Sequence, residues 1–533
     1  MRDRDRSAGL RRIVVALAAV VALGIAAAPA NADWSKPFGL TSPAAPFTFG
    51  DPPTVAVEPD GSFLTAWVQS LPGPKSDANI NARFVKPNGS LGPVLTLTKT
   101  HGDVRTPRIA VAPDGTATVV WHRIVAPQQI ALEAMRVRPD GSMGPQITVS
   151  EPGERALATS LASDSAGNTT VAWVHQINDS SVLRVRRIAA NGDLGPEQTL
   201  TKTVEGRVSD VAAAVGPDNR PLVVYNQFGR LKAQRFSAAG DPVGGVTDIS
   251  GADDTASGLS AKADAAGVVH VSWDRLSPDP LQVFARTVAP DGTLGPTQTV
   301  APDRSAGAKL AVNAAGDASI VWQDTPRTDP ASVQGSTIPA GGEAGHPFRI
   351  SALSQHAGLS PQVGIDAQGT SMSVWQTDLG AAQVIQAGRF SAAGPLGNVK
   401  TLASFNTELI PSPNVGVNPD GAALALWWQG NAKSTNVTAT AAVFTPPSSP
   451  PPVATPPSPK CHGQRADIVG TRHADDIVGT AGKDVIVGRR GADTIRGRGG
   501  NDVVCGNRGH DVLWGGRGHD HLYGGPGRDS KHP

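Results

Sequence analysis

The chain has 533 residues and a formal net charge of +1, with 39% hydrophobic residues, 60 Gly, 45 Pro and only 2 Cys. This length and hydrophobic content allow two or more domains with packed cores, and the abundant Gly and Pro favour a turn-rich, all-β chain over a helical one. The near-neutral charge gives no reason to expect nucleic acid or an anionic membrane as a partner, and two cysteines are too few for a disulfide scaffold.

The first 32 residues have the features of a secretory signal peptide. An arginine-rich start is followed by an apolar run over residues 13–28 and by the small-residue motif ANA at 30–32. We expect cleavage between Ala32 and Asp33, by the general export route rather than the twin-arginine route. The alternative is a membrane anchor, for which the apolar run is short. No later segment has 18 consecutive apolar residues, so we expect a secreted, extracellular mature chain without a membrane span.

Residues 50–444 contain an internal repeat. In each of eight units a turn residue precedes an aromatic residue by six positions, and the units are spaced 48 to 54 residues apart. The aromatic positions are Trp67, Trp121, Trp173, Tyr225, Trp273, Trp322, Trp375 and Trp427. Alternating apolar residues flank Asp-Gly turns, a pattern typical of β-hairpins because Gly accepts positive φ. Each unit therefore predicts two hairpins, and four strands in roughly 50 residues make one β-propeller blade.

The eighth unit lacks its last strand, because the chain runs into prolines after Phe444. Residues 37–45 resemble the fourth strand of the first unit, so we expect the N-terminal segment to complete the last blade and close an eight-bladed ring. Closure removes a free sheet edge. Both Asp-Gly turns of a blade should lie on one face of the ring. The irregular loops after the aromatic residues should lie on the other, where we expect any extracellular glycan or protein ligand to bind.

Several polar residues of the repeat are candidate ligand contacts, although a structural interpretation is available for each. The glutamines just after the repeat aromatic could ring a polar ligand or tie loop backbone to a strand end; they are Gln69, Gln176, Gln227, Gln323, Gln376 and Gln429. The histidines show no metal-ligand spacing, which favours surface or strand-end positions for His101, His122, His175 and His270. Trp428 faces opposite to Trp427, either as a sugar platform or against a neighbouring blade.

An exported hydrolase or lyase with its site on the propeller face is the alternative to a binding module. Sialidases are similar in blade architecture, but they use a Tyr nucleophile and Asp-boxes. Of the two tyrosines here, Tyr225 occupies a repeat-aromatic position and Tyr523 lies in the C-terminal tract. We therefore assign no catalytic residue and favour a non-catalytic protein. The cluster that would favour an enzyme is two or more carboxylates with a His or Arg at the central opening.

Residues 445–460 form a proline-rich linker with too much proline for a helix or a sheet ladder. The expected domains are thus a signal peptide at 1–32, a propeller at 33–444, this linker, and a C-terminal tract at 461–533.

The C-terminal tract repeats every nine residues from Gly470. An aspartate occupies the sixth place of each nonad: Asp475, Asp484, Asp493, Asp502, Asp511, Asp520 and Asp529. The eighth place is apolar, as Ile477, Ile486, Ile495, Val504, Leu513 and Leu522. This pattern resembles the RTX, or hemolysin-type, calcium-binding repeat G-G-x-G-x-D-x-U-x, in which U is a large apolar residue. The resemblance implies a parallel β-roll that binds Ca2+ through these aspartates and serves folding after export.

The spacing gives a physical reason for the ion. Two nonads make one turn of the roll, and turns stack at the interstrand distance, so aspartates of alternate nonads lie above one another. Like charges about 5 Å apart repel by roughly 3 kcal/mol at an effective dielectric of 20. Ca2+ accepts six or more carboxylate and carbonyl oxygens, and its binding should supply folding energy to so small a core. A roll held without metal is the alternative.

Departures from the repeat weaken the prediction for the first nonads. Thr, Arg or Asn replaces the second glycine in five nonads, and arginines crowd the loops, where guanidinium groups could substitute for the ion. The strongest predicted ligands are therefore Asp502, Asp511 and Asp520. Export favours a disulfide between Cys461 and Cys505. The two lie between two and three turns apart, so a bridge requires that the segment before Gly470 fold back as a cap.

Overall fold

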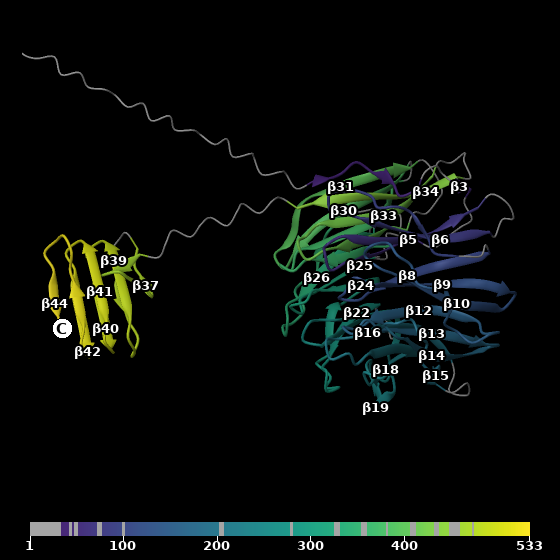
Figure 1. Cartoon of the computed structure of the whole chain (residues 1–533), viewed down its shortest axis with the longest axis horizontal. Coiled ribbons are helices and arrows are strands. Elements are labelled where there is room, and N and C mark those ends of the chain that lie inside the picture. The colour runs from purple at the N-terminus through teal and green to yellow at the C-terminus, as the bar shows by residue number, and fades with distance from the viewer. Residues whose placement is uncertain are drawn as a thin grey trace, which may run out of the picture. The chain divides into compact units, whose positions relative to one another are not determined.

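The structure is a computed structural model. It describes residues 33–41, 45–46, 52–71, 77–98, 102–201, 207–277, 281–324, 331–352, 360–379, 382–405, 412–430, 436–446, 459–471 and 474–533. Strands are the regular elements of these residues, which confirms the all-β class, and no helix within them is long and apolar enough to cross a membrane. The described residues form two compact units, one within 31–447 and one within 448–533 (Figure 1). The predicted signal peptide lies outside the described residues, as does most of the predicted linker.

The first unit is the expected eight-bladed propeller. Seven blades are four-stranded antiparallel sheets built from consecutive strands. Blades one to four contain β4 (Thr54–Val57), β5 (Phe63–Ser70), β6 (Ala78–Val85) and β7 (Leu95–Thr96); β8 (Asp103–Val111), β9 (Ala117–Ala126), β10 (Gln129–Val137) and β11 (Ile147–Thr148); β12 (Ala156–Ser163), β13 (Thr169–Ile177), β14 (Ser180–Ile188) and β15 (Gln198–Thr199); and β16 (Val208–Ala214), β17 (Leu222–Gln227), β18 (Arg230–Phe236) and β19 (Pro242–Asp248).

Blades five to seven repeat this order. They contain β20 (Thr255–Ala263), β21 (Val269–Ser277), β22 (Gln282–Val288) and β23 (Gln298–Ala301); β24 (Ser305–Val312), β25 (Ala318–Asp324), β26 (Ser332–Ile338) and β27 (Phe348–Arg349); and β28 (Gln362–Ile365), β29 (Ser371–Asp378), β30 (Gln383–Ser391) and β31 (Gly394–Phe405).

The eighth blade is closed by the N-terminal segment. Its own strands are β32 (Asn414–Val417), β33 (Ala423–Gly430) and β34 (Asn436–Thr445), and its outer edge is formed by β1 (Asp33–Trp34), β2 (Phe38–Gly39) and β3 (Ala45–Pro46). All three short strands pair antiparallel with β34, which places Asp33 opposite Thr445. The predicted closure is confirmed, and the pairing starts earlier than the expected residues 37–45.

The repeat residues form the core and the turns of the blades. All eight repeat aromatics are at most 2% exposed, so each blade buries one large ring. The turn glycines have positive φ, for example 79° at Gly115. A Cβ at Gly115 would lie 2.6 Å from Cγ of Pro139, in the second turn of the same blade. Both Asp-Gly turns of this blade therefore lie together, as expected.

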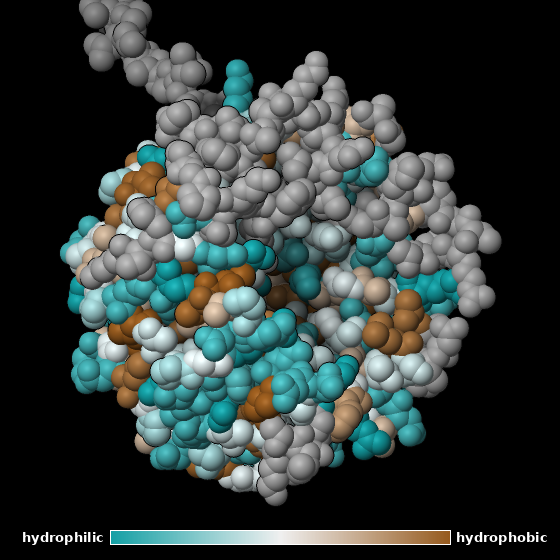
Figure 2. Space-filling model, turned by 90° about the vertical axis from the view of Figure 1, so that its right-hand side faces the viewer, coloured by the Kyte–Doolittle hydropathy of each residue, from teal (hydrophilic) through white to brown (hydrophobic). Residues whose placement is uncertain are grey.

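The eight innermost strands surround a central channel. Each of β4, β8, β12, β16, β20, β24, β28 and β32 contacts the next around the ring, and β32 contacts β4. Three consecutive residues at or next to each of these strands line a channel of about 460 Å³. Figure 2 shows one face of the propeller, with a hollow near its middle.

The second unit is a parallel roll. One sheet contains β37 (Ile468–Val469), β39 (Val485–Arg490), β41 (Val503–Arg508) and β43 (His521–Tyr523), and the other contains β38 (Asp476–Val478), β40 (Thr494–Gly499), β42 (Val512–Arg517) and β44 (Ser530–His532). Partner residues differ by 18, as Ile486 and Val504 do, so two nonads make one turn. The eighth-place side chains form the core between the sheets.

A hairpin caps one sheet of the roll. The strands β35 (Lys460–Cys461) and β36 (Gln464–Arg465) fold back before the first nonad, and a disulfide joins Cys461 to Cys505, with Cα atoms 5.7 Å apart. Cys461 packs with Val485, Val487 and Val503. The fold-back that a bridge requires is present in the structure.

Candidate metal centre

The sixth-place aspartates form a ladder along each edge of the roll. One carboxylate oxygen, Oδ1, accepts a hydrogen bond from the backbone amide of the aspartate 18 residues earlier. The amide of Asp484 donates to Asp502 at 2.9 Å, and the amide of Asp502 donates to Asp520 at 2.9 Å. The other edge repeats this arrangement from Asp475 through Asp493 and Asp511 to Asp529. Two nine-residue repeats make one turn, so each carboxylate stacks on the one that lies 18 residues further along the chain.

The second oxygen of four of these carboxylates is buried without a partner. Oδ2 has no hydrogen-bond partner in Asp493, Asp502, Asp511 and Asp520. Asp502 and Asp511 are fully buried, and Asp493 is 1% exposed. A buried carboxylate oxygen without a donor or a cation is strongly unfavourable. These four oxygens need a hydrogen-bond donor or a cation that the described residues do not supply.

Glycines leave room beside each of these oxygens. A Cβ at Gly497 would lie 2.3 Å from Oδ2 of Asp502 and 2.7 Å from the carbonyl oxygen of Gly515. The same short distance from a built Cβ to Oδ2 occurs in three further pairs: Gly488 with Asp493, Gly506 with Asp511, and Gly515 with Asp520. The cradle thus combines a carboxylate oxygen with a nearby backbone carbonyl, which are the oxygen donors that Ca2+ prefers. The residues present fit a calcium ion.

The electrostatics of the ladder agree with this fit. The pKa values of Asp493, Asp502 and Asp511 are raised, first because burial disfavours the charged form. Repulsion from the stacked neighbours raises them further, as Asp520 and Asp484 do for Asp502, while the backbone hydrogen bond lowers them. A cation between the rungs would reverse both unfavourable effects.

The first two aspartates differ from the four with unpartnered oxygens. At Asp475 the amide of Thr471 donates to Oδ2 at 2.6 Å, and the Thr471 hydroxyl also contacts the carboxylate. At Asp484 the amide and hydroxyl of Thr480 donate to Oδ2 at 2.6 and 3.0 Å. Threonine occupies the place of the second glycine in both nonads, so the protein itself satisfies these carboxylates.

Arginine does not neutralise the ladder. Within the described part of the tract, no arginine forms an ion pair with a sixth-place aspartate, and Arg496 pairs instead with the exposed Asp476. Nor do three or more His, Cys, Asp or Glu side chains of the described residues gather as a metal group. An ion in the roll would therefore depend on backbone carbonyls together with the aspartates.

Comparison with known proteins identifies these repeats. Residues 469–504 and 506–530 match the RTX calcium-binding nonapeptide repeat family, which confirms the resemblance seen in the sequence. The tract carries RTX repeats, and the cofactor of such repeats is calcium. The match covers a small part of the chain, so it classifies this tract alone. The chain has no match among curated proteins.

Solved structures resemble the propeller at low sequence identity. The Dos1 propeller is 10% identical, with a TM-score of 0.48, and the alignment covers 78% of this chain and 95% of that one. A protein of unknown function from Dyadobacter fermentans is 10% identical (TM-score 0.38, 77% and 98% covered). An ulvan lyase is 11% identical (TM-score 0.42, 69% and 97% covered). Similarities at this level carry no argument about activity.

The candidate residues of the propeller make local contacts. Gln176 donates to the backbone oxygen of Asn178, which is the structural role considered for these glutamines, while Gln69 accepts a hydrogen bond from the indole of Trp67. Gln376 donates to Gln383, Gln227 is buried, and Gln429 is exposed. The hydrogen bonds of Gln69, Gln176 and Gln376 each lie within a single blade.

The histidines and Trp428 also have neighbours within the fold. The ring of His122 contacts the hydroxyls of Thr106 and Thr159, and burial lowers its pKa to about 4. His175 accepts a hydrogen bond from the Arg155 amide, and His270 is bonded to Asp264. Trp428 packs against the core shared by blades one and eight, and His101 lies outside the described residues.

Sequence reasoning missed one carboxylate cluster, which lies in blade three. Nε of Arg184 is 3.2 Å from Glu154 and 3.4 Å from Glu197, and Nε2 of His175 is 3.8 Å from Glu154. Burial is the largest cause of the raised pKa values of both glutamates. Glu154 also accepts the indole N–H of Trp173.

Blade two contains a similar set of contacts, which indicates that the cluster has a structural role. There the indole of Trp121 donates to Glu133 at 2.8 Å, and Arg123 pairs with the same carboxylate. A buried indole N–H needs an acceptor, and a buried carboxylate needs a cation. Glu154 and Arg184 meet the same two needs in blade three. No sequence spacing signals such a cluster, because its members come from different strands and a connecting loop.

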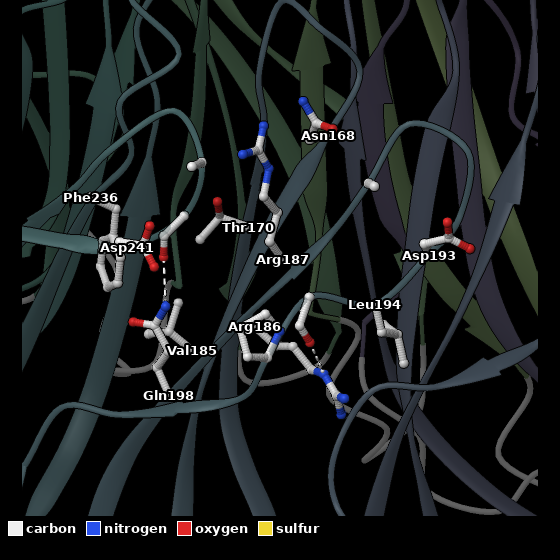
Figure 3. Close-up of a pocket in the computed structure, with 15 residues that line it drawn as sticks. Asn168, Thr170, Val185, Arg186, Arg187, Asp193, Leu194, Gln198, Phe236 and Asp241 are labelled. Atoms are coloured by element: carbon white, nitrogen blue, oxygen red, sulfur yellow. Dashed lines mark hydrogen bonds between the residues drawn. The ribbon is translucent and has the colours of Figure 1, made fainter.

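A groove lies between blades three and four (Figure 3). Like the glutamate cluster, it is a feature of the blade repeat. Its volume is about 350 Å³, and Gln198 crosses it to donate to the backbone oxygen of Gly240. Between blades five and six a groove of about 510 Å³ is crossed in the same way by Gln298 and Gly342. Because the groove recurs with the repeat, it follows from how the outer strands of neighbouring blades diverge.

Proposed function

We propose that the chain is a secreted, calcium-binding and non-catalytic repeat protein whose propeller is a binding or adhesion module. The observation that carries this proposal is the set of unpartnered Oδ2 atoms in the roll, at Asp493, Asp502, Asp511 and Asp520. Calcium supplies the positive charge that these oxygens lack, and each ion joins two successive turns. Binding therefore contributes folding free energy to a unit whose core is small.

The same proposal assigns the segments of the chain. Residues 1–32 are a signal peptide, 33–444 the propeller, 445–460 the linker and 461–533 the roll. The disulfide between Cys461 and Cys505 supports export, because such bonds persist in oxidising compartments. Calcium concentrations are higher outside the cell, so the roll folds after export. An extracellular glycan or protein ligand would bind the propeller face that carries the irregular loops.

The calcium ligands are not equivalent in this proposal. Asp493, Asp502, Asp511 and Asp520 offer a free oxygen, and Asp529 ends the ladder below Asp511. Asp475 and Asp484 are held by threonines and bind the ion more weakly or not at all. The first turn is thus a metal-independent end of the roll.

The alternative is an exported hydrolase or lyase, which a carboxylate cluster with a His or Arg at the central opening would favour. The described lining of the central channel contains no Asp, Glu, His or Arg. The Glu154 cluster of blade three binds an indole as its counterpart in blade two does.

Calorimetric titration of the chelator-treated full chain with CaCl2 tests the proposal. We expect saturable heat that disappears when Asp493, Asp502, Asp511 and Asp520 are all changed to Asn. Changing Asp253, Asp303, Asp420 and Asp476 to Asn instead removes four aspartates outside the ladder and should leave the heat unchanged. Equal heat in both variants would refute the assignment.

A further inference from the structure

The described lining of the propeller's central channel carries one charged side chain, at the middle of its strand segment. Three consecutive residues at or next to each innermost strand line the channel, and apart from Lys262 they are Ala, Gly, Val, Leu, Ile and Ser. Lys262 is therefore the sole titratable group among the described residues of the lining. It lies on β20 of blade five, in the middle position of its three residues.

The equivalent position in the other seven blades is always small: Ala56, Ala110, Ala162, Ala214, Ala311, Gly364 and Gly416. The walls are tight there. A Cβ at Gly416 would lie 3.0 Å from Val55 of the next blade, and one at Gly364 would lie 2.5 Å from Val417. A long side chain cannot continue between the blades at this level, and the Lys262 side chain is exposed in the channel. The seven small residues leave space around it.

No group of the described chain compensates this amine. The Lys262 side chain has no hydrogen bond or ion pair with the described residues. The channel leaves this side chain accessible, but protein surrounds it on all sides, and this surrounding protein lowers the pKa of the amine. Lys309 on β24 lies near Asp210 and Asp274, but none of these three lines the channel. The cross-strand neighbour of Lys262 is His270, which is bonded to Asp264. The described lining is therefore apolar apart from one cation-forming group, and it contains no countercharge.

We propose that the central channel binds a monovalent anion against Lys262. A monoanion supplies the missing countercharge in a region where an unpaired ammonium is unfavourable. An organic carboxylate with a short aliphatic chain adds contact with the apolar walls, whereas chloride supplies charge alone. Binding takes up a proton wherever the amine is neutral, so the affinity falls as the pH rises above the lowered pKa.

Titration calorimetry of the full chain tests the proposal, with sodium butyrate and sodium chloride as separate probes and butyramide as the neutral control. We expect an anion to bind and butyramide not to bind. Butyrate binding identifies the organic carboxylate, and chloride binding identifies the inorganic ion. Binding of neither anion, or equal binding of butyramide and butyrate, would overturn the proposal.

Variants locate the site. Lys262→Met removes the charge at similar length and should weaken anion binding at least about thirtyfold. Lys262→Arg keeps the charge and should retain anion binding. This variant tests the proposal even when Lys262→Met does not fold. Lys232→Met is the matched control, because Lys232 on β18 pairs with Asp248 away from the channel lining. Unchanged affinity in Lys262→Met would overturn the proposal, as would equal losses in Lys262→Met and Lys232→Met.

Discussion

Turn aspartates of the propeller and ladder aspartates of the roll are both buried carboxylates, but their oxygens are satisfied in different ways. Oδ1 of Asp366 accepts the amides of Gln368 and Thr370 at 2.9 and 2.8 Å, within one turn. In Asp164 both oxygens are bonded, Oδ2 to Asn168 and Arg187. Asp502 in the roll has one satisfied oxygen and one that is buried without a partner. These turn aspartates of the propeller are satisfied by donors of the protein itself, whereas the ladder of the roll needs a cation.

Removing calcium should have the largest effect and should separate the two units. In chelator we expect the roll to lose its folded structure and the propeller to keep its own, because only the roll has unpartnered carboxylates in a ladder. Hydrogen exchange of the full chain measures both at once. Protection should disappear in β39–β43 and persist in β5, β9 and β13. Equal protection of the roll with and without calcium would show that it folds without the ion.

Removing the disulfide should have the next largest effect. The bond closes a loop with a sequence separation of 44 residues, and chain entropy then predicts a stabilisation of about 4 kcal/mol. The double variant Cys461→Ser, Cys505→Ser should lower the thermal midpoint of the roll in saturating calcium and leave the propeller transition in place. A roll midpoint equal to that of the parent chain would mean that the cap hairpin contributes little.

Changing one aspartate of the ladder should reduce calcium affinity less than changing all four. Asp502→Asn keeps the shape of a fully buried side chain but removes its charge, so calcium affinity should fall about tenfold to a hundredfold. Asp476→Asn is the control, because Asp476 is exposed and lies outside the ladder. Calorimetry with CaCl2 compares the two. A larger loss in the control would place the ions elsewhere.

Replacing a threonine of the first turn should make its aspartate more like the four that have an unpartnered Oδ2. Thr480→Gly removes the hydroxyl that donates to both oxygens of Asp484 and keeps the backbone amide of residue 480, so this carboxylate should become more available to an ion. We expect a higher calcium stoichiometry or affinity in titration calorimetry, against Thr494→Gly as the control on the neighbouring strand β40. Unchanged binding in Thr480→Gly would show that the threonine does not compete with the metal.

Glu58 differs from the turn aspartates of the propeller, and its substitution should change the stability of the propeller rather than calcium binding. Both of its oxygens are buried without a partner, and burial raises its pKa to about 8. The folded state thus holds a proton that the unfolded state releases near pH 4.5, and stability should fall as the pH rises from about 5 to 8. Glu58→Gln should flatten this dependence and gain about 2 kcal/mol at pH 7 in urea unfolding. An unchanged pH profile would contradict this.

The two units were predictable where their sequence repeats. The spacing of Trp121 and Trp173 gives the blades, and the spacing of Asp502 and Asp511 gives the roll, because one period fixes both the strand pairing and the side chains that become buried. The repeat also placed the N-terminal segment against β34, since one strand was missing from the last unit.

Features that depend on a single deviating residue were not predictable. Lys262 breaks a ring of Ala and Gly, but only the assembled ring shows that this position faces the channel. Thr480 is visible as a replaced glycine, whereas its hydrogen bonds to Asp484 depend on the turn geometry. The contacts of Glu154 with Arg184 join a connecting loop to a strand that follows much later. Such pairings arise from tertiary structure and leave no local pattern.

A crystal structure of the full chain grown with calcium tests the central claim most directly. Anomalous density should appear about 2.3–2.6 Å from Oδ2 of Asp493, Asp502, Asp511 and Asp520, with backbone carbonyls completing each site, and should be weaker or absent beside Asp484. Density for guanidinium groups or water at these oxygens, with no ion bound at saturating calcium, would contradict the account.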